Sequence, residues 1–371
     1  MARELSGRLL PWHGPTRVLV PEDFGLGGDH QAPATRAIQA AIDAAALRGG
    51  GTVRLTRGDY ISGTLELRSN VRLEVIKGAR LLASLDLEDY PPRVAARPTV
   101  MDSNMGVTQS LLFAQGCHNI SLCGEGVIDG RGTKQNFPGS ETVGATPGRP
   151  FLIRVLDCQR VHVAGLHLRD AACWMQNYLN CEDLLIEHLR VENQANFNND
   201  GLDIDGCRRV IVRHCDINSE DDALCFKGAS QRPMEQVLVE SCRLYSSTNG
   251  IKFGTDSQGD FRRILVRNLE VGGPGREMRS VNPRRADSGI SWEVVDGGTV
   301  ENILASGIHI VRAESPLFLR LGDRGRVRPE EPRPAPGHCV ASCSIGSPVR
   351  TTARAAHISS VSRTGRWRMS S

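Results

Sequence analysis

Three stretches decide the fold: RRVIVRHCDI at residues 208–217, EQVLVESCRL at 235–244 and RRILVRNLEV at 262–271. Each stretch carries apolar residues at every second position, which is typical of a β-strand with one buried face. Apolar triplets of this kind begin at Val71, Ile120, Val161, Leu184, Val210, Val237, Ile264 and Ile303. From the third start to the seventh, the gaps are 23, 26, 27 and 27 residues. A period of this length, with several short strands in each repeat, predicts a parallel β-helix.

The main rival with a similar period is a leucine-rich horseshoe. That fold requires leucine at fixed spacings and a ladder of asparagines, and neither occurs here. Three wider gaps, of 49, 41 and 39 residues, leave room for inserted loops or an extra coil. The sequence therefore predicts an all-β fold, a single-stranded right-handed parallel β-helix with a short N-terminal capping α-helix.

The capping helix is predicted at residues 32–48, where Ile38, Ile42 and Leu47 are expected to share one helical face. Three glycines at 49–51 end the helix, and a short strand, TVRL, follows at 52–55. A helix in this position would cover the open N-terminal end of the stacked coils, which otherwise presents unpaired backbone groups.

The repeats define three regions of the chain. Residues 1–16 form an N-terminal extension, and residues 17–325 form the β-helix domain. Residues 326–371 contain the proline-rich segment RPEEPRPAPG at 328–337 and a polar tail rich in arginine. The tail at 351–371 carries no strand units, and we expect residues 326–371 to be poorly ordered or truncated.

Composition excludes several classes of function. The formal net charge is +3, and no run of Lys and Arg alternates with aromatic residues, so we expect no nucleic-acid partner. No run of 18 apolar residues predicts a membrane span, and no secretory signal is visible, so the protein is expected in the cytoplasm unless its start site is misplaced. The eleven cysteines include no C-x-x-C pair with companion ligands. We therefore expect free thiols and no zinc site. Separately, we expect no cofactor and a monomer.

An acidic residue, Asp200, is followed about one structural period later by a pair of acidic residues, Asp221 and Asp222. Asp200 stands in NNDGLDIDG at 198–206, and Asp221 and Asp222 stand in SEDDAL at 219–224. Residues one period apart occupy the same place on neighbouring coils, about 4.8 Å apart. The carboxyl groups would then fall within the roughly 5 to 10 Å separation that glycosidases use. Crowded carboxylates raise the pKa of at least one of them, which leaves a protonated acid beside an ionised base.

A structural role must be weighed for the other acidic residues of this region. Aspartates at coil corners often cap turns through their own backbone, and NNDG is a turn sequence. We favour that role for Asp203 and Asp205, and we expect an ion pair between Asp205 and Lys227, because the period places the two side by side. Two adjacent ionised aspartates repel each other, so the pair Asp221–Asp222 favours a catalytic role.

These residues resemble glycoside hydrolase family 28, the polygalacturonases and their relatives, over roughly residues 17–325. The segments VPEDFGLGGD, AIQAAIDAA and GGGTVRL resemble the N-terminal cap of pectin-active β-helix enzymes in general. NNDG at 198–201 and EDD at 220–222 are similar to motifs specific to the family. The resemblance implies that Asp221 is the general acid and that Asp200 and Asp222 activate water, in an inverting hydrolysis that needs no metal. A pectin-type polysaccharide or oligosaccharide of the plant cell wall is the implied substrate.

The chain departs from the family at two motifs. Where the family has G-H-G, this chain reads TNG, with Asn249 in place of the histidine. Where the family has R-I-K, it reads SWE, with Glu293 in place of the lysine, and a glutamate would repel a uronate. Lys252 and Arg320 could supply positive charge from other coils, or form ion pairs with their neighbours. Asn249, Lys252, Glu293 and Arg320 are therefore candidate substrate-binding residues.

Two tryptophans lie near the predicted site. Trp174, one coil before Asp200, could form a stacking platform for a sugar ring. Trp292, in alternation with Ile290 and Val294, is expected to point into the core.

Two other functions remain open on the same fold. A polysaccharide lyase would need Ca²⁺, which Asp200, Asp203 and Asp205 could bind, and a basic residue for proton abstraction, which is not evident. A non-catalytic carbohydrate-binding β-helix would be consistent with the altered motifs.

Overall fold

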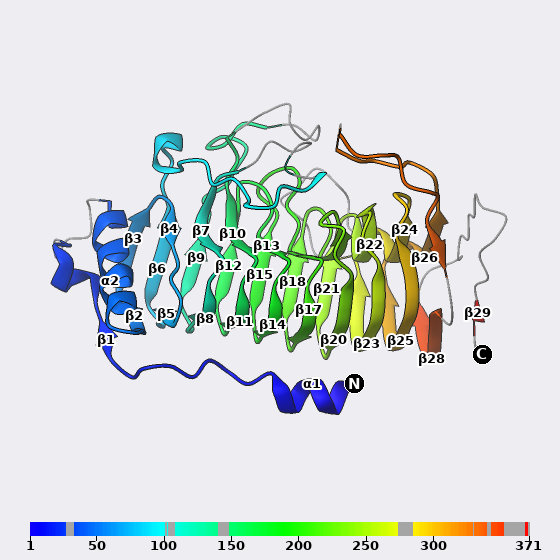
Figure 1. Cartoon of the computed structure of the whole chain (residues 1–371), viewed down its shortest axis with the longest axis horizontal. Coiled ribbons are helices and arrows are strands. Elements are labelled where there is room, and N and C mark those ends of the chain that lie inside the picture. Colours follow the sequence, from blue (N-terminus) through cyan, green and yellow to red (C-terminus); the bar gives the residue numbers. More distant parts are fainter. Residues whose placement is uncertain are drawn as a thin grey trace.

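The computed structural model describes residues 1–26, 33–100, 102, 108–139, 148–273, 285–328, 330–339, 343–351 and 368–369, with side chains up to residue 339. The chain winds into a stack of coils whose strands are all paired in parallel (Figure 1). One sheet of nine strands forms one wall, and a sheet of twenty strands contains two further ladders. The prediction of an all-β parallel β-helix is confirmed.

The strands fall into three columns along the stack. The first column consists of β1 (Val18–Leu19), β2 (Gly51–Leu55), β5 (Val71–Val75), β8 (His118–Cys123), β11 (Gln159–Ala164), β14 (Glu182–Glu187), β17 (Arg208–Arg213), β20 (Met234–Glu240), β23 (Phe261–Gly272), β25 (Thr299–Val311), β27 (His338–Cys339), β28 (Cys343–Thr351) and β29 (Arg368–Met369). The second consists of β3 (Gly58–Ser62), β6 (Ala79–Ala83), β9 (Val127–Asp129), β12 (His167–Arg169), β15 (Arg190–Asn193), β18 (Asp216–Ser219) and β21 (Arg243–Ser246), and continues into the ends of β23 and β25.

The third column is the nine-stranded sheet, and the candidate site lies along it. It consists of β4 (Leu65–Glu66), β7 (Ser110–Gln115), β10 (Phe151–Leu156), β13 (Gln176–Leu179), β16 (Leu202–Asp205), β19 (Leu224–Gly228), β22 (Asn249–Ser257), β24 (Ala286–Val294) and β26 (Ala313–Leu321). Two short 3₁₀ helices, η1 (Pro21–Phe24) and η2 (Leu87–Asp89), lie in the connections.

The register of the first column follows the apolar triplets. Val161 pairs with Ile120 and with Leu184, and the ladder continues through Val210, Val237 and Ile264 to Ile303. β5 pairs directly with β8, and β23 with β25, so the wide gaps are filled by inserted loops and not by extra coils. Alternate residues of these strands enter one continuous apolar core between the columns. The periodicity therefore predicted the register as well as the fold.

The helix α2 (Thr35–Leu47) covers the N-terminal end of the stack, as expected (Figure 1). Its buried face consists of Ala37, Ile38, Ala41, Ile42 and Ala45. Leu47 is 89% exposed, so its predicted place on this face is wrong. It lies nine residues after Ile38, and at about 100° per residue this turns its side chain to the opposite side of the helix.

Alanine in place of Ile42 is expected to lower the free energy of unfolding by about 2–5 kcal/mol, because it leaves a cavity under the cap. Leu47→Ala, in the same helix, is the matched control and is expected to change it by less than about 0.5 kcal/mol. Urea unfolding of both variants measures the difference. Equal losses would contradict the orientation of α2.

The N-terminal extension packs against the outside of the stack. It begins with α1 (Ala2–Arg8), which lies across the strands of the first column (Figure 1). Leu5 and Leu9 are buried there against Leu185, Ile211 and Leu238, which lie on successive coils. The outer face of the first column thus carries an apolar row that the extension covers.

The ladder continues beyond residue 325. β28 pairs with β25 in parallel, and β29 pairs with β28. Most of β28 precedes the tail at 351–371, in which no strand units were expected, and within that tail the described residues Thr351, Arg368 and Met369 belong to strands. Pairing with an existing ladder can recruit a segment whose own apolar pattern is weak. Much of the predicted tail, including 340–342, 352–367 and 370–371, lies outside the described residues. The division into three regions stays a prediction.

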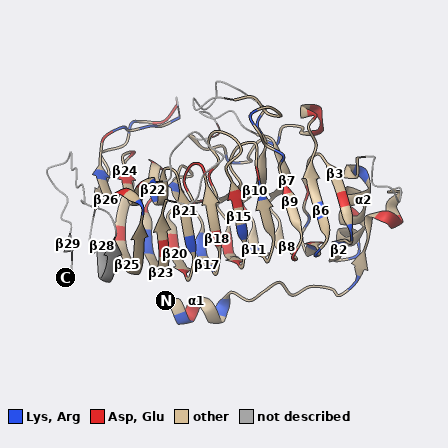
Figure 2. Ribbon diagram, turned by 180° about the vertical axis from the view of Figure 1, so that it is seen from behind, with Lys and Arg blue, Asp and Glu red and all other residues tan. Residues whose placement is uncertain are grey.

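Lys and Arg positions and Asp and Glu positions are interspersed along the strands of the stack (Figure 2). Many of the arginines pair with acidic residues of the neighbouring coil, as Arg213 does with Glu187 at 2.6 Å and Arg209 with Glu182 at 2.7 Å. Much of the arginine content is thus engaged in contacts between coils. The ten cysteines described with side chains are free thiols, mostly buried. No helix among the described residues is long and apolar enough to cross a membrane.

Candidate active site

The predicted acidic residues meet at the turns that lead into the third column. Asp200 precedes β16, Asp221 and Asp222 precede β19, and Asn249 begins β22. The register pairs Leu202 with Leu224 and Leu224 with Ile251, so these turns lie on successive coils. The structure therefore brings Asp200, Asp221, Asp222, Asn249 and Lys252 together.

Asp222 is buried and surrounded by hydrogen-bond donors. Lys252 Nζ lies 3.0 Å from its Oδ2, and Asn249 Nδ2 lies 2.6 Å from its Oδ1. Burial acts to raise the pKa of Asp222, but the charges of Lys252 and Lys227 and the Asn249 hydrogen bond outweigh it, so the pKa lies below its usual value. Asp222 is therefore ionised at neutral pH.

Asp221 has the opposite electrostatic environment. Burial and the negative charge of Asp222 raise its pKa above the usual range. Its Oδ1 accepts a hydrogen bond from the backbone N–H of Asp222 at 3.0 Å and lies 2.9 Å from Thr248 Oγ1. The pKa values of two adjacent carboxyl groups are thus shifted in opposite directions, the pattern expected of a general acid beside a base.

Asp200 lies on the preceding coil, beside the buried side chain of Lys227. Burial and the charges of Asp203 and Asp221 raise its pKa well above the usual value. Lys227 Nζ lies 3.9 Å from Asp200 Oδ2 and 3.3 Å from Asp203 Oδ1. This cation therefore compensates the charges of Asp200 and Asp203.

The expected ion pair between Asp205 and Lys227 is wrong. Their backbones are register partners, but the Lys227 side chain reaches along the sheet to Asp203 and Asp200. Asp205 instead accepts a hydrogen bond from the Ser230 backbone N–H at 3.2 Å. Burial is the largest cause that raises the pKa of Asp205 to about 7.

Asparagine in place of Asp205 is expected to stabilise the protein above pH 7 and to have little effect near pH 4. The pKa of Asp205 rises on folding to about 7, so the stability that its neutral form provides is lost as pH rises from about 4 through 7. Asparagine stays neutral and can keep the hydrogen bond to Ser230. Urea unfolding at several pH values measures the effect, and a stability difference that does not depend on pH would contradict the raised pKa.

The two tryptophans lie where their spacing placed them. Trp292 is 2% exposed and stacks on Phe253 with ring centroids 5.4 Å apart, which confirms its place in the core. Trp174 is 6% exposed, and Lys227 Nζ lies 4.5 Å from its ring centroid. The ring also lies 5.2 Å from that of Phe151, between centroids. Since little of the Trp174 ring is open to solvent, its use as a sugar platform stays a prediction.

Glu293 and Arg320 lie further along the third column. They are register partners on β24 and β26, two and three coils beyond Asp222. Glu293 Oε1 accepts a hydrogen bond from Ser291 Oγ at 2.9 Å, and Arg320 is exposed. Neither residue forms a hydrogen bond or ion pair with Asp200, Asp221 or Asp222 in the described part of the chain, so both stay candidates for contacts with a more distant sugar.

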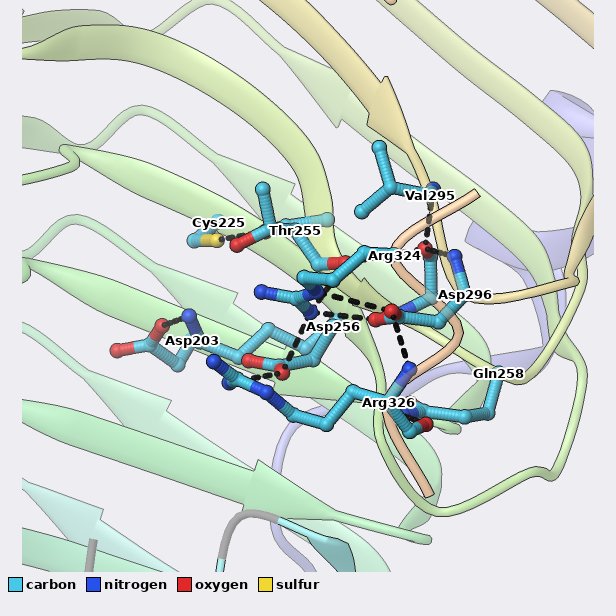
Figure 3. A network of polar contacts seen from close by, with 12 residues as sticks. Asp203, Cys225, Thr255, Asp256, Gln258, Val295, Asp296, Arg324 and Arg326 are labelled. Carbon is cyan, nitrogen blue, oxygen red and sulfur yellow. Dashed lines mark hydrogen bonds and ion pairs between the residues drawn. The ribbon is translucent and has the colours of Figure 1, made fainter. Parts of the chain in front are cut away.

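A polar network beside the site holds the segment that follows β26 (Figure 3). Arg324 Nε lies 2.9 Å from Asp296 Oδ1, and its Nη2 lies 3.1 Å from Asp256 Oδ1. Arg326 Nη1 lies 3.2 Å from the same oxygen of Asp256. Sequence reasoning missed this network, because its arginines lie about 70 residues after Asp256 and outside the repeat. It anchors the segment along the edge of the third column.

Sequence reasoning also missed two hydroxyl groups. Thr248 Oγ1 lies within hydrogen-bond distance of both Asp221 and Asp222, and Ser288 Oγ donates to Asn249 Oδ1 at 2.6 Å. The position of Thr248 in TNG was visible, but which way its side chain points was not.

The calcium site needed for a lyase is not favoured. The lyase hypothesis assigns Asp200 and Asp203 to calcium, but the ammonium group of Lys227 already compensates their negative charge. Within the described ranges, no group of three or more His, Cys, Asp or Glu side chains is arranged to hold a metal ion.

Comparisons with known proteins agree with this geometry. The model of "Glycosyl hydrolases family 28" matches residues 93–271, which include the three carboxylates. A probable polygalacturonase of Vitis vinifera is 25% identical over 304 residues, 77% of this chain and 59% of that protein. A polygalacturonase of Ralstonia solanacearum is 24% identical over 365 residues, 85% of this chain and 66% of that protein. The chain thus spans less than two thirds of these relatives.

The fold is shared with a solved structure. The exopolygalacturonase of Thermotoga maritima superposes with a TM-score of 0.78 at 20% identity, over 99% of this chain and 94% of that one. At this identity the similarity concerns the fold alone. Over residues 93–271, which carry the acidic cluster, the chain is similar to the glycosyl hydrolases family 28.

Proposed function

We propose that the protein is a glycoside hydrolase that cleaves pectin-type polysaccharides or oligosaccharides with inversion of configuration. The observation that carries the proposal is a pair of neighbouring carboxyl groups in opposite environments: Lys252 lies 3.0 Å from Asp222 and lowers its pKa, whereas burial and the charge of Asp222 raise the pKa of Asp221. An acid that protonates the leaving oxygen and a base that activates water are the two groups this reaction needs.

The reaction assigns a proton to each carboxyl group. Asp221 gives its proton to the glycosidic oxygen as the bond from that oxygen to the anomeric carbon breaks. Asp222 takes a proton from a water molecule, whose oxygen forms the new bond to the anomeric carbon from the opposite side. Asp200, whose pKa is raised, supports this water as a hydrogen-bonding partner. The reaction ends with Asp221 ionised and Asp222 protonated.

The charges along the third column favour a mixed substrate. The charge of Lys252 is compensated by Asp222, and on the coils beyond it the exposed or half-exposed acidic residues are Asp287, Glu293 and Glu314. Arg320, the register partner of Glu293, offsets only one of these three negative charges. A free uronate would therefore still be repelled there, whereas a neutral sugar or an ester would not. The relatives named above are polygalacturonases. We therefore propose a pectic chain with a neutral or esterified sugar over β24 and β26, cleaved by a monomeric enzyme.

A substrate screen tests the proposal. Release of reducing ends is measured on homogalacturonan, on its methyl ester, on rhamnogalacturonan and on neutral side-chain oligosaccharides. The anomeric configuration of the first product is read by NMR. We expect release from one of the esterified or mixed substrates, with inversion. An unsaturated product detected by ultraviolet absorbance would instead indicate a lyase, and binding without cleavage of any substrate would indicate a carbohydrate-binding protein.

A further inference from the structure

A single hydroxyl group bridges the two catalytic carboxyl groups. Thr248 Oγ1 lies 2.9 Å from Asp221 Oδ1 and 3.1 Å from Asp222 Oδ1. A threonine hydroxyl has one hydrogen, so it can donate fully to only one of these oxygens at a time. Ser246 Oγ, 3.3 Å from Thr248 Oγ1, is a third acceptor, but its contact is longer and it carries no charge. A carboxylate accepts more strongly than a neutral hydroxyl, so the Thr248 hydroxyl points toward one carboxyl group or the other.

The surrounding contacts fix the threonine but leave its hydroxyl able to turn. The backbone N–H of Thr248 donates to Ser246 Oγ at 2.8 Å, and its carbonyl accepts from Ser288 N at 3.0 Å. Ser246 Oγ donates to the backbone carbonyl of Asp221 at 2.6 Å, so its hydrogen is directed away from Thr248. By contrast, Ser288 holds the Asn249 amide in one orientation, with Nδ2 toward Asp222.

Negative charge moves between the two carboxyl groups during the proposed reaction. It lies on Asp222 before cleavage and on Asp221 afterwards. We infer that the Thr248 hydroxyl follows this charge, donating to Asp222 in the free enzyme and turning to Asp221 as that residue gives up its proton. The hydrogen stays on Thr248 throughout, and only its direction changes. This inference rests on the proposed function and makes Thr248 a positioning residue for both proton transfers.

A donor that turns toward developing charge lowers the barrier more than a fixed one. Asn249 and Lys252 favour the ionised form of Asp222, so they stabilise the enzyme before cleavage. A hydrogen bond that Asp221 gains only as it ionises is stronger in the transition state than in the ground state. As Asp222 takes up a proton, its contacts with Asn249 and Lys252 weaken. The hydrogen bond from Thr248 to ionised Asp221 compensates for part of this loss.

The charges around the pair come from four elements of the third column and from the turn before it. Acting on Asp221 and Asp222 are Asp200 before β16, Lys227 from β19, Lys252 from β22 and Asp287 from β24, with Glu293 of β24 and Glu314 of β26 behind them. None of these groups is altered by a substitution at Thr248.

Valine in place of Thr248 tests the inference, because it keeps the shape and removes the hydroxyl. A hydrogen bond to a carboxylate lowers its pKa, so its loss raises the pKa of both residues. Both limbs of the pH–rate profile are then expected to move to higher pH, with kcat lowered roughly 10- to 100-fold and KM within about twofold. Thr248→Ser, which keeps the hydroxyl, is expected to restore both limbs. A valine variant with unmoved limbs would overturn the inference.

A titration separates this inference from the proposed function. Protein labelled with ¹³C at its aspartate carboxyl groups is titrated by NMR, with signals assigned from Asp221→Asn and Asp222→Asn. Thr248→Val is expected to raise both midpoints. Thr64→Val, which removes another buried hydroxyl that donates to Ser110 O at 2.7 Å, is expected to leave them unchanged. This readout needs no substrate, so it supports or overturns the hydroxyl contact even if the wild type cleaves none of the sugars tested.

Discussion

Asparagine in place of Asp221 is expected to lower kcat by about 10²- to 10⁴-fold, the range that positioned general acids contribute. Asparagine keeps the size of the side chain and can keep its contacts with Thr248 and the Asp222 backbone, but it has no proton to give at neutral pH. The loss is expected in kcat with little change in KM, because Asp221 acts on the leaving oxygen and not on substrate affinity. Initial rates on the best substrate of the screen measure both.

Asp216→Asn is the matched control for this prediction. Asp216 lies on β18, is 41% exposed and pairs with Arg243 on the surface, so its replacement is expected to change kcat by less than about twofold. Should Asp221→Asn keep most of its activity, another acid would have to supply the proton. Asp287 would then be the next candidate, because burial and its acidic neighbours also raise its pKa.

The register and the acidic cluster could be predicted because both depend only on spacing. A residue one period later lies on the next coil of a parallel ladder, whatever its side chain does. Leu202, Leu224 and Ile251 follow this rule, and the turns that carry Asp200, Asp222 and Asn249 are placed by it. Sequence periodicity therefore locates backbone positions well.

Side-chain directions were predicted less well. The register placed Lys227 beside Asp205, but four methylene groups let its ammonium group reach Asp203, where two buried carboxyl groups attract it. Thr248 was seen only as part of an altered motif, and its contacts with Asp221 and Asp222 depend on its rotamer. The face of Leu47 was wrong for a simpler reason, since nine residues do not complete a whole number of helical turns.

Strand pairing outside the repeat also escaped prediction. β28 carries no clear apolar triplet, yet it pairs with β25 because the last coil offers unpaired backbone groups. The ion pairs of the arginines after β26 could not be predicted either, because their partners, Asp256 and Asp296, lie on earlier coils. In both cases the deciding contact is supplied by a distant part of the chain.

Methionine in place of Lys227 is expected to lower the free energy of unfolding by about 3–5 kcal/mol at neutral pH, because it leaves buried carboxyl groups without their cation. Methionine fills the volume of the aliphatic stem beside Trp174, so the loss reports charge and not a cavity. Urea unfolding measures it, and Lys77→Met, at an exposed position, is the control that should change little.

The dependence of this loss on pH and on Asp203 identifies its cause. Without the ammonium group, Asp200 and Asp203 must either carry buried charge or bind protons, so their pKa values in the folded state rise further above the unfolded value. Stability from an acid with a raised pKa is present at low pH and is lost as pH rises, so the penalty of Lys227→Met should grow from about pH 4 upward. Adding Asp203→Asn removes one uncompensated carboxylate and should recover part of the loss. If the penalty stayed constant with pH and the double variant recovered nothing, Lys227 would act through its packing on Trp174, and the cluster would not depend on its charge.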